Sequence, residues 1–188
     1  MISIIRKREK KDSKQLLRKE LQRLAICEFM AIPNFWFVYM LLWILCVKVG
    51  INFVNTPIVI YPLSLLSFIL VQGSIYWYIC LRRIDGKSVP KKNALIYSKL
   101  KVVNLFLILL YIPIFLKFNA STNNIMIGMF IYIFSILEYI NYFFIRLSYK
   151  NPLHFFANLK RFKFPKSQIV KEIEKYQNKI DTYKINRL

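Results

Sequence analysis

Histidine, glycine and cysteine are scarce in this chain of 188 residues, which has one histidine, four glycines and three cysteines. A single histidine, His154, cannot build a histidine-rich metal site or a catalytic triad by itself. The four glycines lie far apart, which excludes a glycine-rich phosphate loop. Cys27, Cys46 and Cys80 follow no metal-ligand or redox spacing, so we interpret them as small apolar residues. We therefore expect no metal, no cofactor and no enzymatic activity.

Acidic residues are also few, and the charged residues are separated from the apolar ones. Nine Asp and Glu stand against 29 Lys and Arg, a net charge of +20, yet 56% of the residues are hydrophobic. Residues 31–81 contain one charged residue, Lys48, and residues 102–145 contain only Lys117 and Glu138. A soluble domain this apolar would expose large hydrophobic patches. Segregation of this kind is typical of a membrane protein.

Four hydrophobic stretches are long enough to cross a bilayer as helices. They cover about residues 29–49, 57–81, 97–118 and 125–147. Pro57 suits the first helical position of the second stretch, where its missing N–H would have no helical partner. The sequence therefore predicts an all-α, polytopic membrane protein with a four-helix transmembrane domain over residues 29–147.

Basic segments flank this domain on both sides. Residues 1–28 are predicted to form a cytoplasmic amphipathic helix that lies on the membrane and leads into the first span, since Leu17, Leu21 and Leu24 share one helical face. Residues 148–188 are predicted to form a basic cytoplasmic tail with an amphipathic helix over about residues 165–186. The chain thus divides into an N-terminal helix, a membrane domain and a tail.

The distribution of basic residues predicts the orientation. The N-terminal segment holds nine Lys and Arg, the loop 82–101 holds seven and the C-terminal segment holds eleven. The two opposite loops hold one each, Lys48 and Lys117, so 27 of 29 basic residues fall on one side. The positive-inside rule assigns that side to the cytoplasm. We expect a multi-pass protein of the plasma membrane with both termini in the cytoplasm.

Glu138 is the acid that lies inside a predicted span. It precedes Arg146 by eight residues, which corresponds to ~12 Å along a helix. A charged acid at that depth is costly, so we expect Glu138 to face the bundle interior. Gln72 is predicted at nearly the same depth, and Asn104 and Asn141 lie nearer the cytoplasm. The sequence predicts an intramembrane polar cluster of these four residues, either as a proton or ion site or as hydrogen bonds that hold helices together.

A mixture of basic and aromatic residues is predicted next to the cytoplasmic surface. Its members are Arg82, Arg83, Lys160, Arg161, Phe162 and Lys163. Such a mixture can bind single-stranded nucleic acid, where bases stack on aromatic rings. Beside a membrane the same mixture suits anionic lipid headgroups, and we favour that interpretation. Nucleic acid is not an expected partner.

The predicted C-terminal helix carries a regular apolar seam. Its residues, spaced four and three apart, are Ile169, Ile173, Tyr176, Ile180 and Tyr183. The spacing is that of a heptad repeat, but two heptads are fewer than a coiled coil normally needs. The seam predicts self-association, and docking against the chain's own helices or against lipid is the alternative.

Together these features predict a small, non-enzymatic integral membrane protein. We expect a subunit of a membrane assembly that presents a basic cytoplasmic face to anionic lipid or an acidic protein partner, and that forms a homo-oligomer or binds a membrane or cytoplasmic protein. The alternative is an oligomeric pore, such as a bacterial toxin or defence effector, with Glu138 and Gln72 near the conduction path. The abundance of Ile, Lys, Asn, Phe and Tyr is typical of an AT-rich, bacterial genome.

Overall fold

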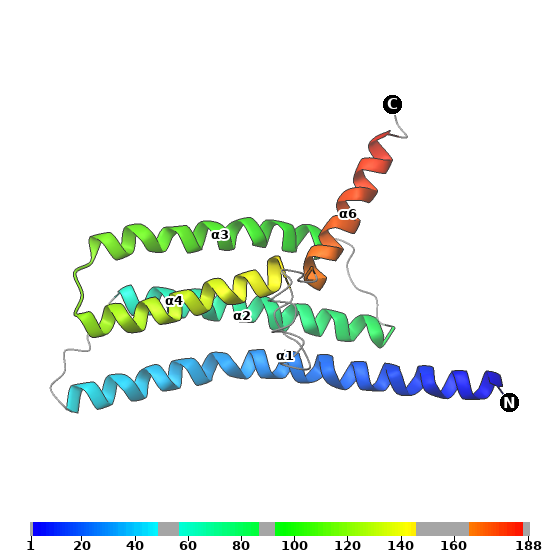
Figure 1. Cartoon of the computed structure of the whole chain (residues 1–188), viewed down its shortest axis with the longest axis horizontal. Coiled ribbons are helices and arrows are strands. Elements are labelled where there is room, and N and C mark those ends of the chain that lie inside the picture. The colour runs from blue at the N-terminus through cyan, green and yellow to red at the C-terminus, as the bar shows by residue number, and fades with distance from the viewer. Residues whose placement is uncertain (1, 49–56, 87–92, 146–165, 186–188) are drawn as a thin grey trace, which may run out of the picture. The chain divides into compact units, whose positions relative to one another are not determined.

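The computed structural model describes residues 2–48, 57–86, 93–145 and 166–185, with side chains described over residues 12–48, 57–86, 93–145 and 166–178. These residues form five helices, which Figure 1 labels. They are α1 (Ile2–Lys48), α2 (Pro57–Ile84), α3 (Asn93–Lys117), α4 (Thr122–Phe143) and α6 (Gln168–Ile185). Within these ranges the chain is helical and contains no β-strand, so the predicted all-α class is confirmed.

Four of the helices are long and apolar enough to cross a membrane. They are the segments Asp12–Lys48, Pro57–Ile84, Asn93–Lys117 and Thr122–Phe143. Each overlaps one of the four predicted spans, and α2 begins at Pro57 as expected. These helices indicate a multi-pass membrane protein.

Helix α1 is continuous from Ile2 to Lys48, so the predicted N-terminal helix and the first span form one helix. It has 47 residues, or ~70 Å at 1.5 Å per residue, whereas the hydrocarbon core is only ~30 Å thick. No glycine or proline interrupts it before Pro33. The predicted position of residues 1–28 on the membrane surface stays a prediction.

The end of α4 differs from the prediction. The helix ends at Phe143, four residues before the predicted limit of 147, and the backbone of Phe144 leaves the helical conformation with φ −134° and ψ −67°. Ile145 then forms an isolated antiparallel bridge with Lys166, and the N–H of Ser167 donates to the carbonyl oxygen of Phe144 at 3.1 Å. These backbone bonds fix the start of α6 beside the end of α4, which local sequence could not indicate.

The chain forms two compact units, and the boundary between them falls inside α2. One unit comprises Met1–Ile51 and Leu70–Pro90, and thus α1 with the second part of α2. The other comprises Asn52–Ile69 and Lys91–Leu188, and thus the first part of α2 with α3, α4 and α6. Each unit is described below by itself.

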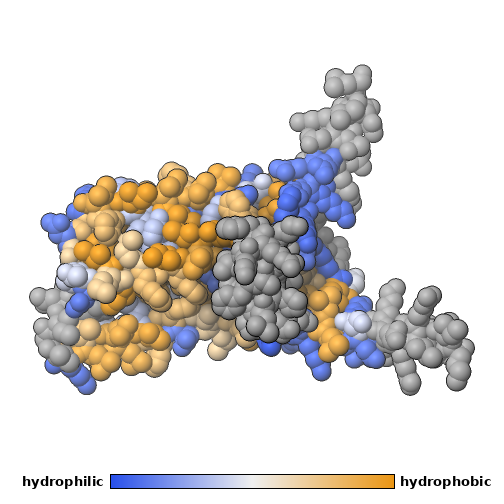
Figure 2. Space-filling model, in the orientation of Figure 1, coloured by the Kyte–Doolittle hydropathy of each residue, from blue (hydrophilic) through white to orange (hydrophobic). Residues whose placement is uncertain are grey.

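In the second unit, about half of the side chains in the first part of α2 are buried. Its buried apolar side chains are Ile58, Val59, Leu63, Leu65, Leu66 and Ile69. By contrast, α3 and α4 each turn many apolar side chains outward, among them Phe106, Leu116, Met126 and Phe130. Figure 2 displays this apolar surface over α3 and α4 and the hydrophilic surface of α6. Outward apolar side chains on a membrane helix are suited to contact with lipid.

Candidate functional site

A proline in α2 creates the most specific polar contact between the helices. Pro62 has no N–H, so the carbonyl oxygen of Ile58 loses its usual partner four residues later. The hydroxyl of Tyr111 on α3 donates to that oxygen at 3.1 Å. Both residues are almost fully buried, with 1% of each exposed. The tyrosine therefore satisfies a carbonyl that the proline has freed in a region without water.

Gly128 on α4 lies against the same carbonyl. A Cβ atom at this position would come within 2.5 Å of the Ile58 carbonyl oxygen and 2.9 Å of the Ile58 Cγ2 atom. It would also lie 3.1 Å from the hydroxyl of Tyr111. Only glycine allows the backbones of α2 and α4 to approach so closely while the tyrosine keeps its bond. Three helices thus meet at one point, which we call the Ile58 node (Ile58, Pro62, Tyr111 and Gly128).

Further tyrosines extend the Ile58 node along the helices. Tyr61 donates to the carbonyl oxygen of Leu107 at 2.7 Å, and Tyr132 donates to that of Ile108 at 3.0 Å. The ring of Tyr111 lies between those of Tyr61 and Tyr132, with centroid distances of 6.1 and 4.3 Å. Each hydroxyl donates a hydrogen bond to a backbone carbonyl oxygen of a neighbouring helix. These tyrosines therefore have a structural role.

Polar contacts of the same kind continue toward the C-terminal end of α4. The Ser135 hydroxyl lies 2.9 Å from the carbonyl oxygen of Ile131 in its own helix and 3.2 Å from that of Pro62 in α2. Tyr139 donates to the carbonyl oxygen of Lys101 at 3.0 Å, and the Lys101 ammonium lies 4.2 Å from the ring centroid of Phe144. The start of α3 and the end of α4 are thereby joined.

Glu138 forms a local pair with one of its predicted neighbours. Asn141, one turn further along α4, donates from Nδ2 to Glu138 Oε2 at 3.3 Å. Both side chains are half-buried. The pair lies within a single helix, so this hydrogen bond does not join two helices.

The other two members of the predicted polar cluster are buried on different helices. Asn104 lies on α3 in the second unit and is completely buried. Gln72 lies on the part of α2 that belongs to the first unit and is 6% exposed. The hydrogen bond between Asn141 and Glu138 is one contact within the predicted cluster, and a joint role for all four residues stays a prediction.

In the first unit, α1 and the second part of α2 run antiparallel and share three polar contacts. The Ser74 hydroxyl donates to the carbonyl oxygen of Ala25 at 2.9 Å. Trp77 Nε1 donates to Glu28 Oε1 at 2.7 Å. Nearer the end of α2, Arg18 forms an ion pair with Asp85 at 3.0 Å. Arg18, Ala25 and Glu28 therefore contact the second part of α2.

The predicted basic and aromatic surface is only partly visible. Arg82 and Arg83 lie in the last turn of α2 and are exposed. Lys160, Arg161, Phe162 and Lys163 lie outside the described residues. Their proposed contact with lipid headgroups therefore stays a prediction.

The apolar seam of α6 begins inside the chain. Ile169 and Ile173 are buried, and α6 contacts both α3 and α4. This is the arrangement that the docking alternative expects for these two residues. Tyr176 is half-buried, and the side chains of Ile180 and Tyr183 lie outside the described residues. Self-association through the seam stays a prediction.

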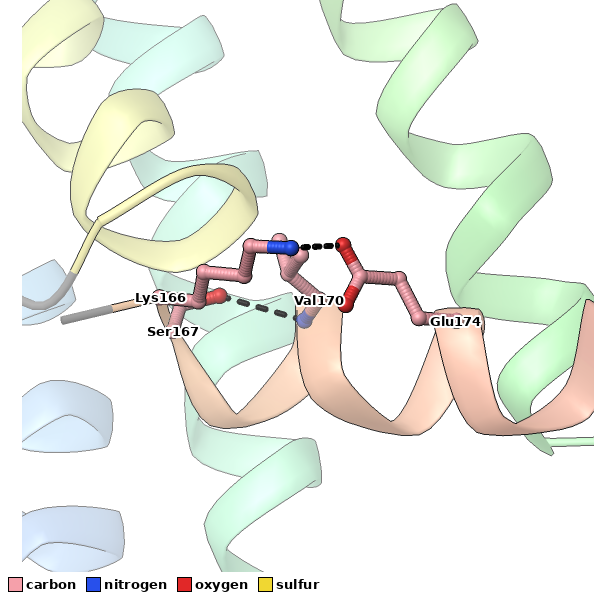
Figure 3. A network of polar contacts seen from close by, with 4 residues as sticks. All are labelled: Lys166, Ser167, Val170 and Glu174. Atoms are coloured by element: carbon pink, nitrogen blue, oxygen red, sulfur yellow. Dashed lines mark hydrogen bonds and ion pairs between the residues drawn. The ribbon is translucent and has the colours of Figure 1, made fainter.

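Two polar contacts stabilise the start of α6 (Figure 3). The Oγ of Ser167 accepts a hydrogen bond from the N–H of Val170 at 3.2 Å, which is the geometry of a helix N-cap. Lys166 Nζ lies 2.6 Å from Glu174 Oε1 across two turns of the helix. Because Ser167 is buried, this bond gives the N–H of Val170 an acceptor where water has little access. The cap and the bridge to Ile145 both fix where α6 begins.

Within the part of the chain that the structure describes, no group of three or more His, Cys, Asp or Glu side chains could hold a metal ion. Comparison with protein families, with curated proteins and with solved structures gives no match. Neither the residues nor a relative therefore indicates a specific reaction.

Sequence reasoning missed the Ile58 node and the bond between Trp77 and Glu28. Tyrosines inside spans look like ordinary apolar residues, and Glu28 was placed just outside the first span. A proline inside a span was a usable signal, because it always frees one carbonyl oxygen. Which residue satisfies that oxygen depends on helix packing, which the sequence does not give directly.

Proposed function

We propose that this chain is a non-enzymatic subunit of a plasma-membrane assembly, and that its strongly basic cytoplasmic face binds an acidic surface. The proposal is supported by the distribution of Lys and Arg, since 27 of the 29 fall on one side when all four candidate spans cross the membrane. Those 27 bases stand against eight acids other than Glu138, a net charge of +19 on that side. A field of this size attracts anionic lipid or an acidic protein segment.

The described contacts are consistent with this role. Basic side chains at the ends of α2, α3 and α6 are exposed, namely Arg82, Arg83, Lys99, Lys166, Lys171 and Lys175. The eight acids on that side neutralise at most eight of the 27 positive charges. A large positive potential therefore remains for a partner.

The polar groups of the spans support a structural task. Tyr61, Tyr111, Tyr132 and Ser135 all direct their hydroxyls to backbone carbonyl oxygens. Hydroxyls engaged in this way stabilise helix packing and are poorly placed to act on a substrate. A stable helical scaffold that carries a basic face can bind a partner without catalytic residues.

Binding to an acidic surface can be measured with the full chain in nanodiscs of zwitterionic lipid. We expect the nanodiscs to bind vesicles that contain phosphatidylserine and not vesicles of phosphatidylcholine alone, with binding weakened between 0.05 and 0.5 M salt because salt screens exposed charges. The variant Arg82→Glu with Arg83→Glu should bind more weakly. Its matched control is Lys48→Glu with Lys117→Glu, which changes two bases on the opposite side and should leave binding unchanged.

The orientation is tested by labelling single cysteines in intact cells after the native cysteines are replaced. Positions 52 and 121 should react with a membrane-impermeant reagent, and positions 10, 88 and 175 should not. Reaction at position 88 would contradict the proposed topology. It would also remove the basis for a cytoplasmic basic face.

The pore alternative is distinguished by dye release from liposomes that contain the purified chain. A non-conducting subunit should release no more dye than empty liposomes. If dye is released, Glu138→Gln decides whether the acid acts by ionising, since Gln keeps the size and hydrogen-bonding groups of the protonated acid but carries no charge. Loss of conduction in a stable Glu138→Gln variant would favour the pore over the proposal made here.

A further inference from the structure

The apolar part of α1 is the least buried of the four candidate spans. None of its most apolar window is buried, whereas more than half of the corresponding window of α2 is. Glu28, Phe35 and Tyr39 are half-buried and lie on one face, the face that contacts α2 through Glu28. The opposite face of α1 has no described contact of this kind.

That opposite face carries a regular stripe of exposed residues. Its members are Met30, Asn34, Phe37, Leu41 and Ile44, spaced alternately four and three apart, and we call them the α1 stripe. Met30 is 58%, Phe37 60%, Leu41 43% and Ile44 42% exposed. A spacing that averages 3.5 residues is the seam by which two helices supercoil around each other. Spacing alone says little in a helix this apolar, so the decisive residue is Asn34.

Asn34 is a strongly polar side chain inside the apolar part of α1. It lies six residues after Glu28 and 14 residues before Lys48, or ~9 Å and ~21 Å along the helix. At that depth acyl chains offer neither a donor nor an acceptor. A primary amide has two N–H donors and one carbonyl acceptor, and leaving them without partners in hydrocarbon is unfavourable. Asparagine at such a place favours contact with another helix.

We propose that the α1 stripe pairs with the α1 stripe of a second copy of this chain, and that the two Asn34 amides hydrogen-bond to each other. An amide is complementary to itself, since its N–H group donates to the carbonyl oxygen of an identical group. Two copies inserted with the same orientation are related by a two-fold axis along the membrane normal. Their α1 helices are then parallel, and equal residues meet at equal depth.

Paired asparagines on parallel helices are also known from coiled coils. A single asparagine on the apolar seam fixes the register and the number of helices. The α1 stripe has one asparagine, with apolar residues on both sides of it. The proposal rests on the role of the chain as a membrane subunit and names one partner in that assembly. It does not depend on what the basic face binds.

The native cysteines provide the first test. Cys27 lies three residues before Met30, continues the α1 stripe and is exposed, whereas Cys46 lies on the face of α1 that includes Glu28 and is half-buried. Membranes containing the full chain are oxidised with copper phenanthroline. The variant Cys46→Ala with Cys80→Ala should form disulfide-linked dimers through Cys27. The control variant Cys27→Ala with Cys80→Ala, which keeps only Cys46, should stay monomeric on a gel.

The second test measures the dimer directly by energy transfer between labelled chains that are diluted in liposomes. Asn34→Leu should weaken the dimer about threefold to thirtyfold, which corresponds to ~0.6–2 kcal/mol for an interhelical hydrogen bond in lipid. Asn34→Gln keeps an amide and should retain most of the affinity. Met40→Leu, which changes an exposed residue outside the stripe, serves as the control and should have no effect.

Three results would overturn the proposal. The first is a chain that stays monomeric at every dilution, which would leave the stripe in contact with lipid. The second is a dimer that Asn34→Leu does not weaken, and the third is cross-linking of Cys27 only to a different protein. Failure of the basic-face proposal is separate, because it would appear as a normal dimer whose nanodiscs do not bind anionic vesicles.

Discussion

The first part of α2 and the membrane part of α1 have similar composition but different surroundings. Both are apolar enough to cross a bilayer, and their most apolar windows have nearly equal mean hydropathy. In α2 the side chains of Ile58, Val59, Leu63 and Ile69 are almost completely buried. In α1 most of the apolar side chains are exposed, Phe37 and Leu45 among them. Hydropathy therefore measures whether a helix suits a membrane, and not whether protein or lipid surrounds it.

The two helices differ in the polar contacts that hold them. The Ile58 node uses backbone atoms, because a proline frees a carbonyl, a glycine allows close approach and a tyrosine donates the missing hydrogen bond. Three polar contacts described between α1 and α2 use a serine, a tryptophan and an exposed ion pair, and they involve α1 residues before Phe29. Without water, packing and hydrogen bonding must supply helix association. We therefore expect substitutions in the Ile58 node to have the larger effects.

The largest effect is expected from Gly128→Leu. Even a Cβ atom would come within 2.5 Å of the Ile58 carbonyl oxygen, so α2 and α4 must separate. We expect a loss of at least ~1–3 kcal/mol, the usual cost of overpacking, measured as a lower midpoint in unfolding by sodium dodecyl sulfate. Met129→Leu, which changes the exposed neighbouring residue, should leave the midpoint unchanged. Equal stability of the two variants would mean that α2 and α4 do not make this close contact.

A smaller effect is expected from Tyr111→Phe, which leaves the Ile58 carbonyl oxygen without its donor. The expected loss is ~1–3 kcal/mol, the cost of an unsatisfied buried group. Pro62→Ala supplies a backbone N–H for the same oxygen, so in that background Tyr111→Phe should cost less. A double-mutant cycle measures this coupling. If the two substitutions are simply additive, the proline does not explain the position of the tyrosine.

In the first unit, Trp77→Phe removes the hydrogen bond to Glu28. We expect a loss of ~0.6–2 kcal/mol, typical of a hydrogen bond between membrane helices. Glu28→Gln keeps an acceptor oxygen and should have little effect. The readout is hydrogen exchange of the amides of residues 20–32, which should accelerate in Trp77→Phe and stay unchanged in Glu28→Gln. Faster exchange in both variants would indicate that the acid has a role beyond accepting this bond.

The smallest effect is expected from Asp85→Asn. Its partner Arg18 has 56% of its side chain exposed, and exposed ion pairs contribute only ~0–1 kcal/mol. The change in the unfolding midpoint should disappear in 0.5 M salt, because salt already screens this pair. A loss as large as that of Trp77→Phe would contradict the comparison between side-chain and backbone contacts.

Much of the fold was predictable from the sequence. The four spans, the all-α class and the start of α2 at Pro57 follow from hydropathy and from the properties of proline. Two features were not predictable. These are the end of α4 at Phe143 and the position of α6 beside α3 and α4. Each depends on contacts between residues far apart in the chain, such as the bridge between Ile145 and Lys166.

The candidate site was predictable only in its local part. Glu138 and Asn141 are one turn apart, so their hydrogen bond follows from helical geometry. Contacts such as that of Tyr111 with Ile58 need two helices at a given distance and rotation. An apolar helix can present any face to its neighbours with little change in hydropathy, and so its sequence leaves the rotation open.

The sequence by itself determined that the chain crosses a membrane, because water cannot solvate such long apolar segments, and it determined where positive charge gathers. Only the tertiary structure decided which apolar helix is buried and which is exposed. The physical reason is that hydrocarbon and protein interior are almost equally favourable for apolar side chains. Whether a helix is surrounded by protein or by lipid therefore depends on a few close contacts. In this chain those contacts are made by the freed carbonyl of Ile58, the hydroxyl of Tyr111 and the side-chain-free Gly128.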